Sequence, residues 1–274
     1  MKKWMRTTLL CVFAAVFLAS ATYLAVYLVN SKKAANSYTA LEQIKEEAPT
    51  TPRPTINPDG TITPSTTPPV HVDVTDPNTG EVHRVLPEFK ELYAKNNDIV
   101  GWLQVPGIDI SYPVMQTPDR PNYYLYRNFG KEDSKHGCLY VQENCDVNTP
   151  SDNVIIYGHH MQDGSMFAKL GRFAKKDFLE QNPYIYFDTL TEVHTYQIVA
   201  VFTTTVTVGK GFAFYDFINA KDADAFNRFI DTCRAYSTFN TGVEVEYGDK
   251  LISLVTCEYS QINGRLVVVA KRLF

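Results

Sequence analysis

Short apolar segments bounded by turn residues recur along the C-terminal two thirds of the chain and constrain its fold most strongly. Residues that favour strands, with Gly, Pro, Asn or Asp at the borders, are typical of short β-strands. Many short strands and few long helices favour a mainly β domain, either a barrel or a sandwich. The 190 residues from 85 to 274 suffice for one such domain with a sizeable core. The expected strands are 100–105, 137–142, 154–157, 184–187, 195–205, 250–256 and 265–271.

One helix is expected to interrupt this pattern, between the strand 195–205 and the strand 250–256. Residues 220–236 place apolar side chains on one face at helical spacing, and Asn219 is expected to cap the N-terminus. The apolar face consists of Ala223, Phe226, Phe229, Ile230 and Cys233.

The N-terminal region predicts a membrane anchor. Residues 7–29 form a stretch of 23 residues without a charge, which exceeds the roughly 20 needed to span a bilayer as a helix. Ala19-Ser20-Ala21 resembles a signal-peptide cleavage site, but the apolar run continues past where a signal peptide would end. Basic residues before the helix place residues 1–6 in the cytoplasm and the remainder outside; they are Lys2, Lys3 and Arg6.

Residues 30–84 are expected to be a Pro/Thr-rich linker. Residues 31–47 can continue the helix from the membrane, but Pro and Thr dominate from Pro49 onward. Such a stretch buries too little apolar surface to fold and favours extended, polyproline-like conformations. A semi-rigid spacer is therefore preferred to a proline-motif docking site.

Charge and cysteine content narrow the functional classes. The formal net charge is −4, so the basic surface of a nucleic-acid-binding protein is missing. Cys11 lies in the apolar N-terminal stretch, and Cys233 is expected to pack in the core. A disulfide between Cys138 and Cys145 is conceivable in an exported chain.

Residues 251–269 suggest nucleophilic chemistry. Two adjacent strands are joined there by a loop containing Asn263-Gly264; Cys257 ends the first strand and Arg265 begins the second. A reactive thiolate needs nearby positive charge, acyl transfer needs a donor to the oxyanion, and an arginine can serve either need. The common alternative for a single cysteine at this place is a packed structural thiol.

A histidine pair supplies a possible proton-transfer group. Strand 154–157 ends at Gly158, His159 and His160 follow on a loop, and a helix is expected after Asp163-Gly164-Ser165. A histidine just past a strand end is held rigidly yet open to a cleft, although adjacent loop histidines are often plain surface residues. We expect no metal site, because Cys138 and Cys145 lack zinc-ligand spacing and His136 adds a single donor.

These motifs together resemble the class B sortases, the cysteine transpeptidases of Gram-positive cell surfaces. The resemblance rests on YGHHMQDGSMF at 157–167, SLVTCE at 253–258 and NGR at 263–265. It extends over roughly 85–274: residues 86–115 resemble the family's N-terminal helix and first strands, and residues 122–146 the region before the histidine strand. Three positions depart from the family pattern, namely Ser253 for Thr, Val255 for Ser and His160 for Asn.

The resemblance implies a sortase-like closed β-barrel with an N-terminal helix and a long helix before the cysteine strand. It implies catalytic roles for Cys257, His159 and Arg265, without a metal or other cofactor. It further implies substrate contacts by Glu258, Thr256 and Leu125.

The implied activity is transpeptidation by a single-pass protein of the cell membrane with an extracellular catalytic domain. The enzyme would cleave surface proteins after the Thr of a C-terminal sorting signal, NPxTN-like or (N/S/P)PxTG. A peptidoglycan cross-bridge amine would then accept the acyl group. A pilin-polymerising sortase, a hydrolytic cysteine peptidase and a membrane-tethered binding module with a vestigial site are the alternatives.

Overall fold

The computed structural model describes residues 3–57, 60–76, 78–260 and 262–274. It divides into two units, Met1–Ala40 and Leu41–Phe274. The helices are α1 (Lys3–Glu47), α2 (Lys90–Lys95), α3 (Lys176–Gln181) and α4 (Ala223–Tyr236). The strands are β1 (Thr55–Ile56), β2 (Ile62–Thr63), β3 (Val72–Thr75), β4 (Val82–Val85), β5 (Ile99–Val105), β6 (Ile110–Met115), β7 (Leu139–Val141), β8 (Asn153–Tyr157), β9 (Tyr184–Thr189), β10 (Thr195–Thr205), β11 (Leu251–Glu258) and β12 (Gly264–Arg272).

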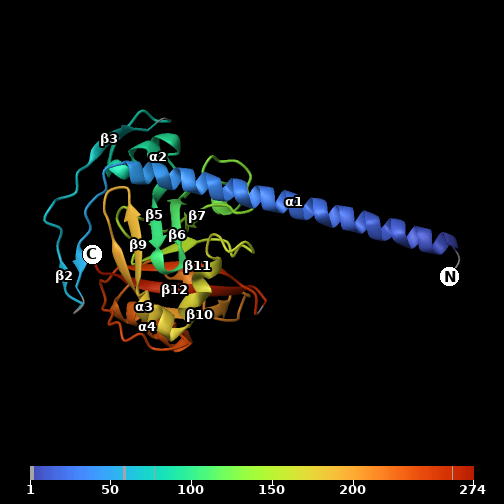
Figure 1. Cartoon of the computed structure of the whole chain (residues 1–274). Helices are drawn as coiled ribbons and strands as arrows, with labels where there is room; N and C mark the ends of the chain where they lie inside the picture. The colour runs from blue at the N-terminus through green and yellow to red at the C-terminus, as the bar shows by residue number, and fades with distance from the viewer. Residues whose placement is uncertain (1–2, 58–59, 77, 261) are drawn as a thin grey trace. The chain divides into compact units, whose positions relative to one another are not determined.

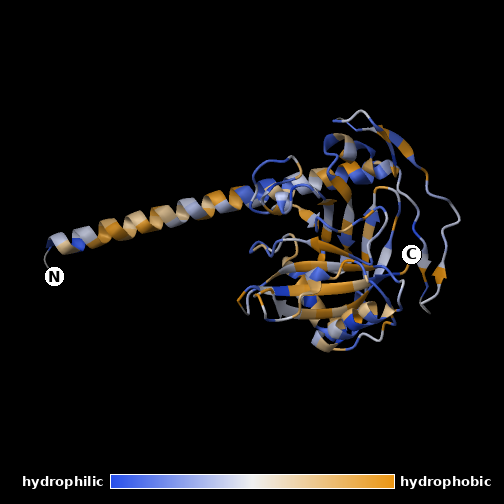
Figure 2. Cartoon of the chain, turned by 180° about the vertical axis from the view of Figure 1, so that it is seen from behind, coloured by the Kyte–Doolittle hydropathy of each residue, from blue (hydrophilic) through white to orange (hydrophobic). Residues whose placement is uncertain are grey.

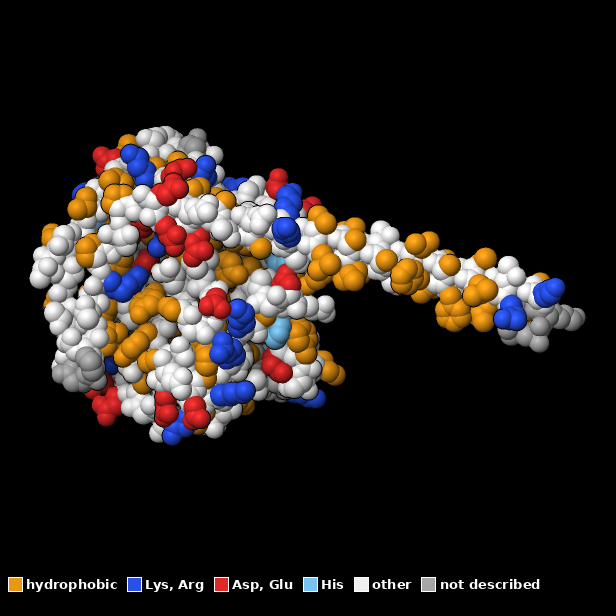
Figure 3. Space-filling view, viewed as in Figure 1, with side chains coloured by type: hydrophobic (Ala, Val, Ile, Leu, Met, Phe, Trp, Pro, Cys, Tyr) orange, Lys and Arg blue, Asp and Glu red, His pale blue; other side chains and the backbone are white. Residues whose placement is uncertain are grey.

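The first unit is helical throughout its described residues and belongs to α1. Figure 2 shows apolar residues along most of this part of the helix, and Figure 3 shows their side chains on its surface. Within the described chain, α1 is the one helix whose length and composition would allow it to cross a membrane. A signal sequence near an N-terminus has the same properties, so the anchor at 7–29 stays a prediction.

Eight strands of the second unit close into a barrel in the order β10-β12-β11-β8-β7-β6-β5-β9, and β9 pairs with β10 (Figure 1). The β8–β11 and β6–β7 pairs are parallel, and the other pairs are antiparallel. Closure leaves the sheet without a free edge. The mainly β prediction is therefore confirmed, as a barrel rather than a sandwich.

All seven predicted strands form, with ends shifted by a few residues, and β6 joins them. The Pro113 ring within β6 weakens a strand signal, because proline cannot donate to the ladder. Residues 251–256 of β11 and 266–270 of β12 are buried without alternation. Such runs are typical of strands that are covered on both faces.

The predicted long helix exists as α4, but it begins later than expected. Its N-cap is Asp222, whose carboxylate accepts from the Ala225 N–H at 2.7 Å. The predicted cap, Asn219, instead accepts the Asp152 N–H at 3.0 Å. Ala223 is exposed, whereas the other four apolar residues assigned to the buried face are buried as expected; they are Phe226, Phe229, Ile230 and Cys233.

The helix predicted directly after Asp163-Gly164-Ser165 does not form there. Met166 adopts a left-handed backbone conformation with φ 54° and forms a β-bridge with His160. A 3-10 helix follows only at Ala168–Ala174. The segment therefore folds back toward the histidine loop before any helix can begin.

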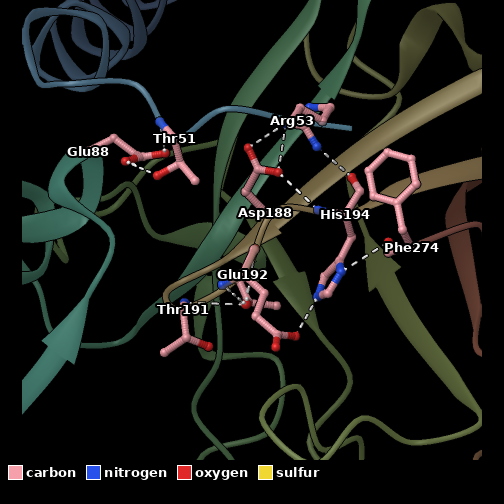
Figure 4. A network of polar contacts seen from close by, with 9 residues as sticks. Thr51, Arg53, Glu88, Asp188, Thr191, Glu192, His194 and Phe274 are labelled. Atoms are coloured by element: carbon pink, nitrogen blue, oxygen red, sulfur yellow. Dashed lines mark hydrogen bonds and ion pairs between the residues drawn. The ribbon is translucent and has the colours of Figure 1, made fainter. Parts of the chain in front are cut away.

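Residues 51–54, here called the strap, lie against the barrel rather than extending as a free spacer (Figure 4). The Arg53 guanidinium donates to both carboxylate oxygens of Asp188 at 2.8 and 2.9 Å and to the His194 carbonyl at 2.8 Å. Thr51 donates from its hydroxyl to Glu88 at 3.0 Å. Polar anchors thus hold a segment whose composition offers little apolar surface.

The conceivable disulfide between Cys138 and Cys145 is not formed; both side chains are buried as thiols. The Cys145 thiol donates to the Asn153 carbonyl at 3.6 Å. Burial raises the pKa of Cys145 to about 11, so this thiol is a packed group rather than a nucleophile.

Candidate active site

Cys257 and Arg265 are direct partners in the antiparallel β11–β12 register. The Val255 carbonyl accepts from the Gly158 N–H at 3.0 Å, so the carbonyls of Val255 and Cys257 point toward β8 rather than β12. Cys257 and Arg265 therefore form a non-hydrogen-bonded pair, in which Cα atoms lie only about 4.5 Å apart and the side chains share one face. The Arg265 guanidinium donates to the Gly264 carbonyl at 2.8 Å, and both side chains are half-buried.

His159 reaches the same place from the neighbouring strand. In the parallel β8–β11 register, Tyr157 is the partner of Val255. Two residues further along each chain, His159 comes beside Cys257. Gly158 is needed at this bend, because a Cβ there would lie 2.5 Å from Leu139 and 2.6 Å from Phe167.

The surroundings of His159 favour a neutral ring with a defined tautomer. Nε2 lies 2.7 Å from the Leu125 carbonyl, which can only accept, so Nε2 carries the proton and Nδ1 is the basic nitrogen. Burial lowers the pKa of His159; the hydrogen bond to Leu125 opposes this and the charge of His136 adds to it. The Tyr126 ring covers His159 with centroids 5.3 Å apart.

A groove of about 690 Å³ joins these residues. Cys257, His159 and Arg265 line it, together with Thr256 and Leu125. Its other lining residues are Asn122, Tyr126, Tyr140, Gln142, Glu143, Asn144, Tyr157, Gly158, Val206, Phe214, Tyr215, Asp216 and Val255. The groove therefore gives a substrate access to the cysteine, the histidine and the arginine together.

The expected substrate contacts differ in their setting. The Thr256 hydroxyl is buried and lacks a hydrogen-bond partner among the described residues. Leu125 lines the groove and holds His159 with its carbonyl. Glu258 is absent from the described lining of the groove, and its carboxylate accepts from the Ser260 N–H at 2.9 Å and hydroxyl at 2.6 Å.

Known proteins with the same pattern identify the family. The family model of the sortase domain matches residues 103–273, more than half of the chain. Sortase B of Staphylococcus aureus (strain NCTC 8325 / PS 47) is 33% identical over 189 residues, which cover 68% of this chain and 75% of that protein. The chain belongs to the sortase family, class B.

Another relative and two solved structures agree. Sortase B of Listeria monocytogenes serovar 1/2a (strain ATCC BAA-679 / EGD-e) is 31% identical over 67% of this chain and 73% of its own length. A crystal structure of sortase B from Bacillus anthracis in complex with AAEK1 has a TM-score of 0.68 at 27% identity, covering 89% of this chain and 98% of that one. A sortase B–substrate complex from S. aureus has a TM-score of 0.62 at 31% identity, covering 69% and 86%. The chain is accordingly a sortase cysteine transpeptidase.

Sequence reasoning missed the polar wall of the sortase groove. The Tyr157 hydroxyl donates to the Gln142 side-chain carbonyl at 2.6 Å, and the Gln142 amide donates to the Tyr215 carbonyl at 3.0 Å. Tyr140 stacks near Tyr157 with centroids 5.5 Å apart. The Tyr140–Tyr157 pair follows from the β7–β8 register, but no sequence signal points to Tyr215, which belongs to the loop between β10 and α4.

That loop, rather than α4 itself, contributes to the groove of the sortase domain. The loop contributes Val206, Phe214, Tyr215 and Asp216 to the lining of the groove. In contrast, α4 packs on β10 through its buried face. The helix thus supports the loop from behind. Among the described residues, no cluster of three or more His, Cys, Asp or Glu side chains has the arrangement of a metal site.

Proposed function

We propose that this sortase is membrane-anchored and cleaves a C-terminal sorting signal through a thioacyl-enzyme on Cys257. The observation that carries the proposal is the meeting of Cys257, His159 and Arg265 around one groove. Cys257 is half-buried and lines the groove, whereas Cys138, Cys145 and Cys233 are buried and Cys11 lies in α1. A groove-lining cysteine next to a histidine and an arginine fits covalent acyl transfer.

The proton transfers use Nδ1 of His159. The Cys257 thiol passes its proton to Nδ1 and the thiolate attacks the carbonyl carbon of the substrate Thr. The scissile C–N bond then breaks, and the imidazolium returns the proton to the departing amine. An incoming amine attacks the thioester, gives a proton to Nδ1 and releases Cys257. The Leu125 carbonyl favours the imidazolium of each step, because it accepts from Nε2–H.

Arg265 stabilises the negative oxygen that develops on the Thr carbonyl. Its guanidinium stays charged at every physiological pH and lines the groove on the face that carries Cys257. Its hydrogen bond to the Gly264 carbonyl orients the planar group.

Substrate recognition is proposed for Thr256, Leu125 and Glu258. Thr256 would contact the sorting signal from its place in the groove lining, directly before Cys257. Leu125 would contact the signal within the groove. Glu258 would act only on residues that extend beyond the groove lining, because its carboxylate holds the Ser260 turn.

The proposed substrate is a surface protein with an NPxTN-like or (N/S/P)PxTG signal, and the acceptor is a peptidoglycan amine. A structure of S. aureus sortase B holds a substrate, and another sortase B structure holds triglycine, which supports this pairing. We further propose residues 7–29 of α1 as a single-pass anchor. Residues 1–6 would then be cytoplasmic, residues 30–84 would connect to the catalytic domain 85–274, and that domain would be extracellular.

The test uses the full chain in detergent with a library of sorting peptides. Mass spectrometry should find an acyl adduct on Cys257 with signals of the proposed form, and the adduct should be absent from Cys257→Ala. Added triglycine should convert the adduct into an amide product. Hydrolysis that triglycine leaves unchanged would point to a peptidase. A preference for a pilin lysine over triglycine would point to pilus polymerisation.

A further inference from the structure

We propose that His160 is a positioning residue that holds the end of β11 against the loop carrying His159. The proposal deepens the assignment above, because it rests on Cys257 as the nucleophile. The imidazole Nδ1 of His160 lies 3.1 Å from the Cys257 carbonyl oxygen. A carbonyl can only accept, so Nδ1–H is the donor.

This contact takes the place of a missing rung in the β8–β11 ladder. In a parallel pair, the hydrogen bonds between the two strands repeat every two residues along each strand. The Gly158 N–H donates to the Val255 carbonyl, so the next rung would join the His160 N–H to the Cys257 carbonyl. The His160 side chain supplies the donor there in place of its main chain.

Other contacts hold the His160 ring and backbone in this position. The Tyr259 ring meets the imidazole edge-on with centroids 5.2 Å apart, and the Tyr259 hydroxyl donates to the His160 carbonyl at 3.4 Å. His160 also forms a β-bridge with Met166. The imidazole is thus fixed between the loop after β8 and the loop after β11, which favours one ring orientation.

The consequence concerns the geometry between the nucleophile and the base. His159 and His160 are adjacent, and His160 is bound to the residue that carries the thiol. The two rings donate from different nitrogens, Nε2 in His159 and Nδ1 in His160. Without the hydrogen bond from His160, the last hydrogen bond that ties β11 to the segment after β8 would be the one from the Gly158 N–H to the Val255 carbonyl. A displacement of reacting groups by about 1 Å can lower the rate about 10²-fold. Loss of the His160 contact should therefore lower kcat.

Two amide substitutions separate this role from a general packing role. The Asn side-chain amide nitrogen lies at about the place of Nδ1, whereas that of Gln lies at about the place of Nε2. With a sorting peptide and triglycine, His160→Asn should keep kcat/KM within about twofold, whereas His160→Gln should lower it about tenfold, mainly through kcat. Tyr259→Phe keeps the ring contact but removes the hydroxyl contact to the His160 carbonyl, so it should lower kcat/KM by less than His160→Gln does.

Equal activity of His160→Gln and wild type, or equal losses in both amide variants, would overturn the proposal. If either variant fails to fold, ¹⁵N NMR of the wild-type protein provides the test, because it reports which nitrogen of the His160 imidazole carries the proton. At neutral pH an Nδ1–H tautomer of His160 supports the contact and an Nε2–H tautomer refutes it. The acyl adduct on wild-type Cys257 separates the nucleophile assignment of Cys257 from the positioning role of His160. No adduct refutes the nucleophile assignment, whereas an adduct with fully active His160→Gln refutes only the positioning role.

Discussion

His159 donates from Nε2 to the main-chain carbonyl of Leu125, 2.7 Å away. Leu125 therefore contributes to the site through its backbone as well as through its place in the groove. The hydrogen bond leaves Nδ1 as the basic nitrogen of the neutral ring, which is the nitrogen proposed above for the proton transfers.

NMR titration of His159 should show a pKa below 6.5 and the Nε2–H tautomer in the neutral ring. Burial disfavours the imidazolium, and the hydrogen bond to Leu125 only partly offsets this effect. ¹⁵N chemical shifts of the imidazole across pH 4 to 8 measure both quantities. A midpoint above 6.5, or a neutral ring protonated at Nδ1, would contradict the arrangement.

Removal of the Thr256 hydroxyl should separate stability from activity. Thr256→Val removes a buried hydroxyl that lacks a partner among the described residues, so the free energy of unfolding should rise by about 1 kcal/mol or stay unchanged. The kcat/KM for a sorting peptide should fall about tenfold if the hydroxyl binds the substrate.

Thr195→Val is the matched control for this variant. Its hydroxyl is also buried and without a partner among the described residues, but Thr195 does not line the groove. Urea unfolding should shift in the same direction, and turnover should stay at the wild-type level. An equal loss of turnover in both variants would rule out a specific contact to Thr256.

Arg53→Gln should destabilise the catalytic unit by about 3 kcal/mol, because it leaves the Asp188 carboxylate buried without its cation. The Asp188 side chain is 3% exposed and the Arg53 side chain 24%. Lys176→Gln breaks an exposed pair with Glu180 and should cost less than about 0.5 kcal/mol. Urea unfolding of the full chain in detergent measures both. Similar values for the two variants would mean that the strap is not anchored by Arg53.

Stability should fall as the pH drops from 6.5 toward 4, in part because of His194. Burial lowers the pKa of His194 to about 4, so between these values the unfolded chain binds a proton that the folded chain does not. The loss attributable to this group is about 3 kcal/mol. His194→Asn keeps a donor near the Phe274 carbonyl but cannot titrate. Its unfolding free energy should therefore change less over this range; an identical profile would exclude His194 as the cause.

Asp222→Ala should lower the free energy of unfolding by about 1 kcal/mol, because it removes the side chain that caps α4. Asn219→Ala changes the residue that the sequence pattern favours as the cap and should cost less than half as much. Thermal or urea unfolding of the two variants under the same conditions decides between the two N-termini. A larger effect at Asn219 would restore the predicted start of the helix.

Local sequence patterns predict the parts of the structure that depend on neighbours along the chain. The strands around Cys257 and Arg265 follow from apolar runs and the Asn263-Gly264 turn, and their pairing brings both residues to one face. The apolar face of α4 also follows from its spacing. About a hundred residues separate His159 from Cys257, so local patterns do not pair them and only the family resemblance does.

Features made by distant polar residues escape such patterns. Arg53 and Asp188 are 135 residues apart, and nothing near either residue indicates an ion pair. Tyr215 enters the groove from a loop whose path depends on the packing of α4 on β10. Asn219 and Asp222 are both residue types that cap helices well, so the sequence alone does not decide which of them accepts the free N–H groups at the start of α4.

The groove is lined partly by paired strands and partly by a loop, and these two parts differ in how readily their sequence can vary among relatives. The residues proposed for chemistry lie on or next to β8, β11 and β12, which are joined by backbone ladders, so their mutual geometry is inherited from the sheet. The lining also includes Tyr215 and Asp216, which belong to the loop between β10 and α4 and lie outside the paired strands. Relatives with a different loop between β10 and α4 could thus exchange one set of target proteins for another while keeping the same reaction.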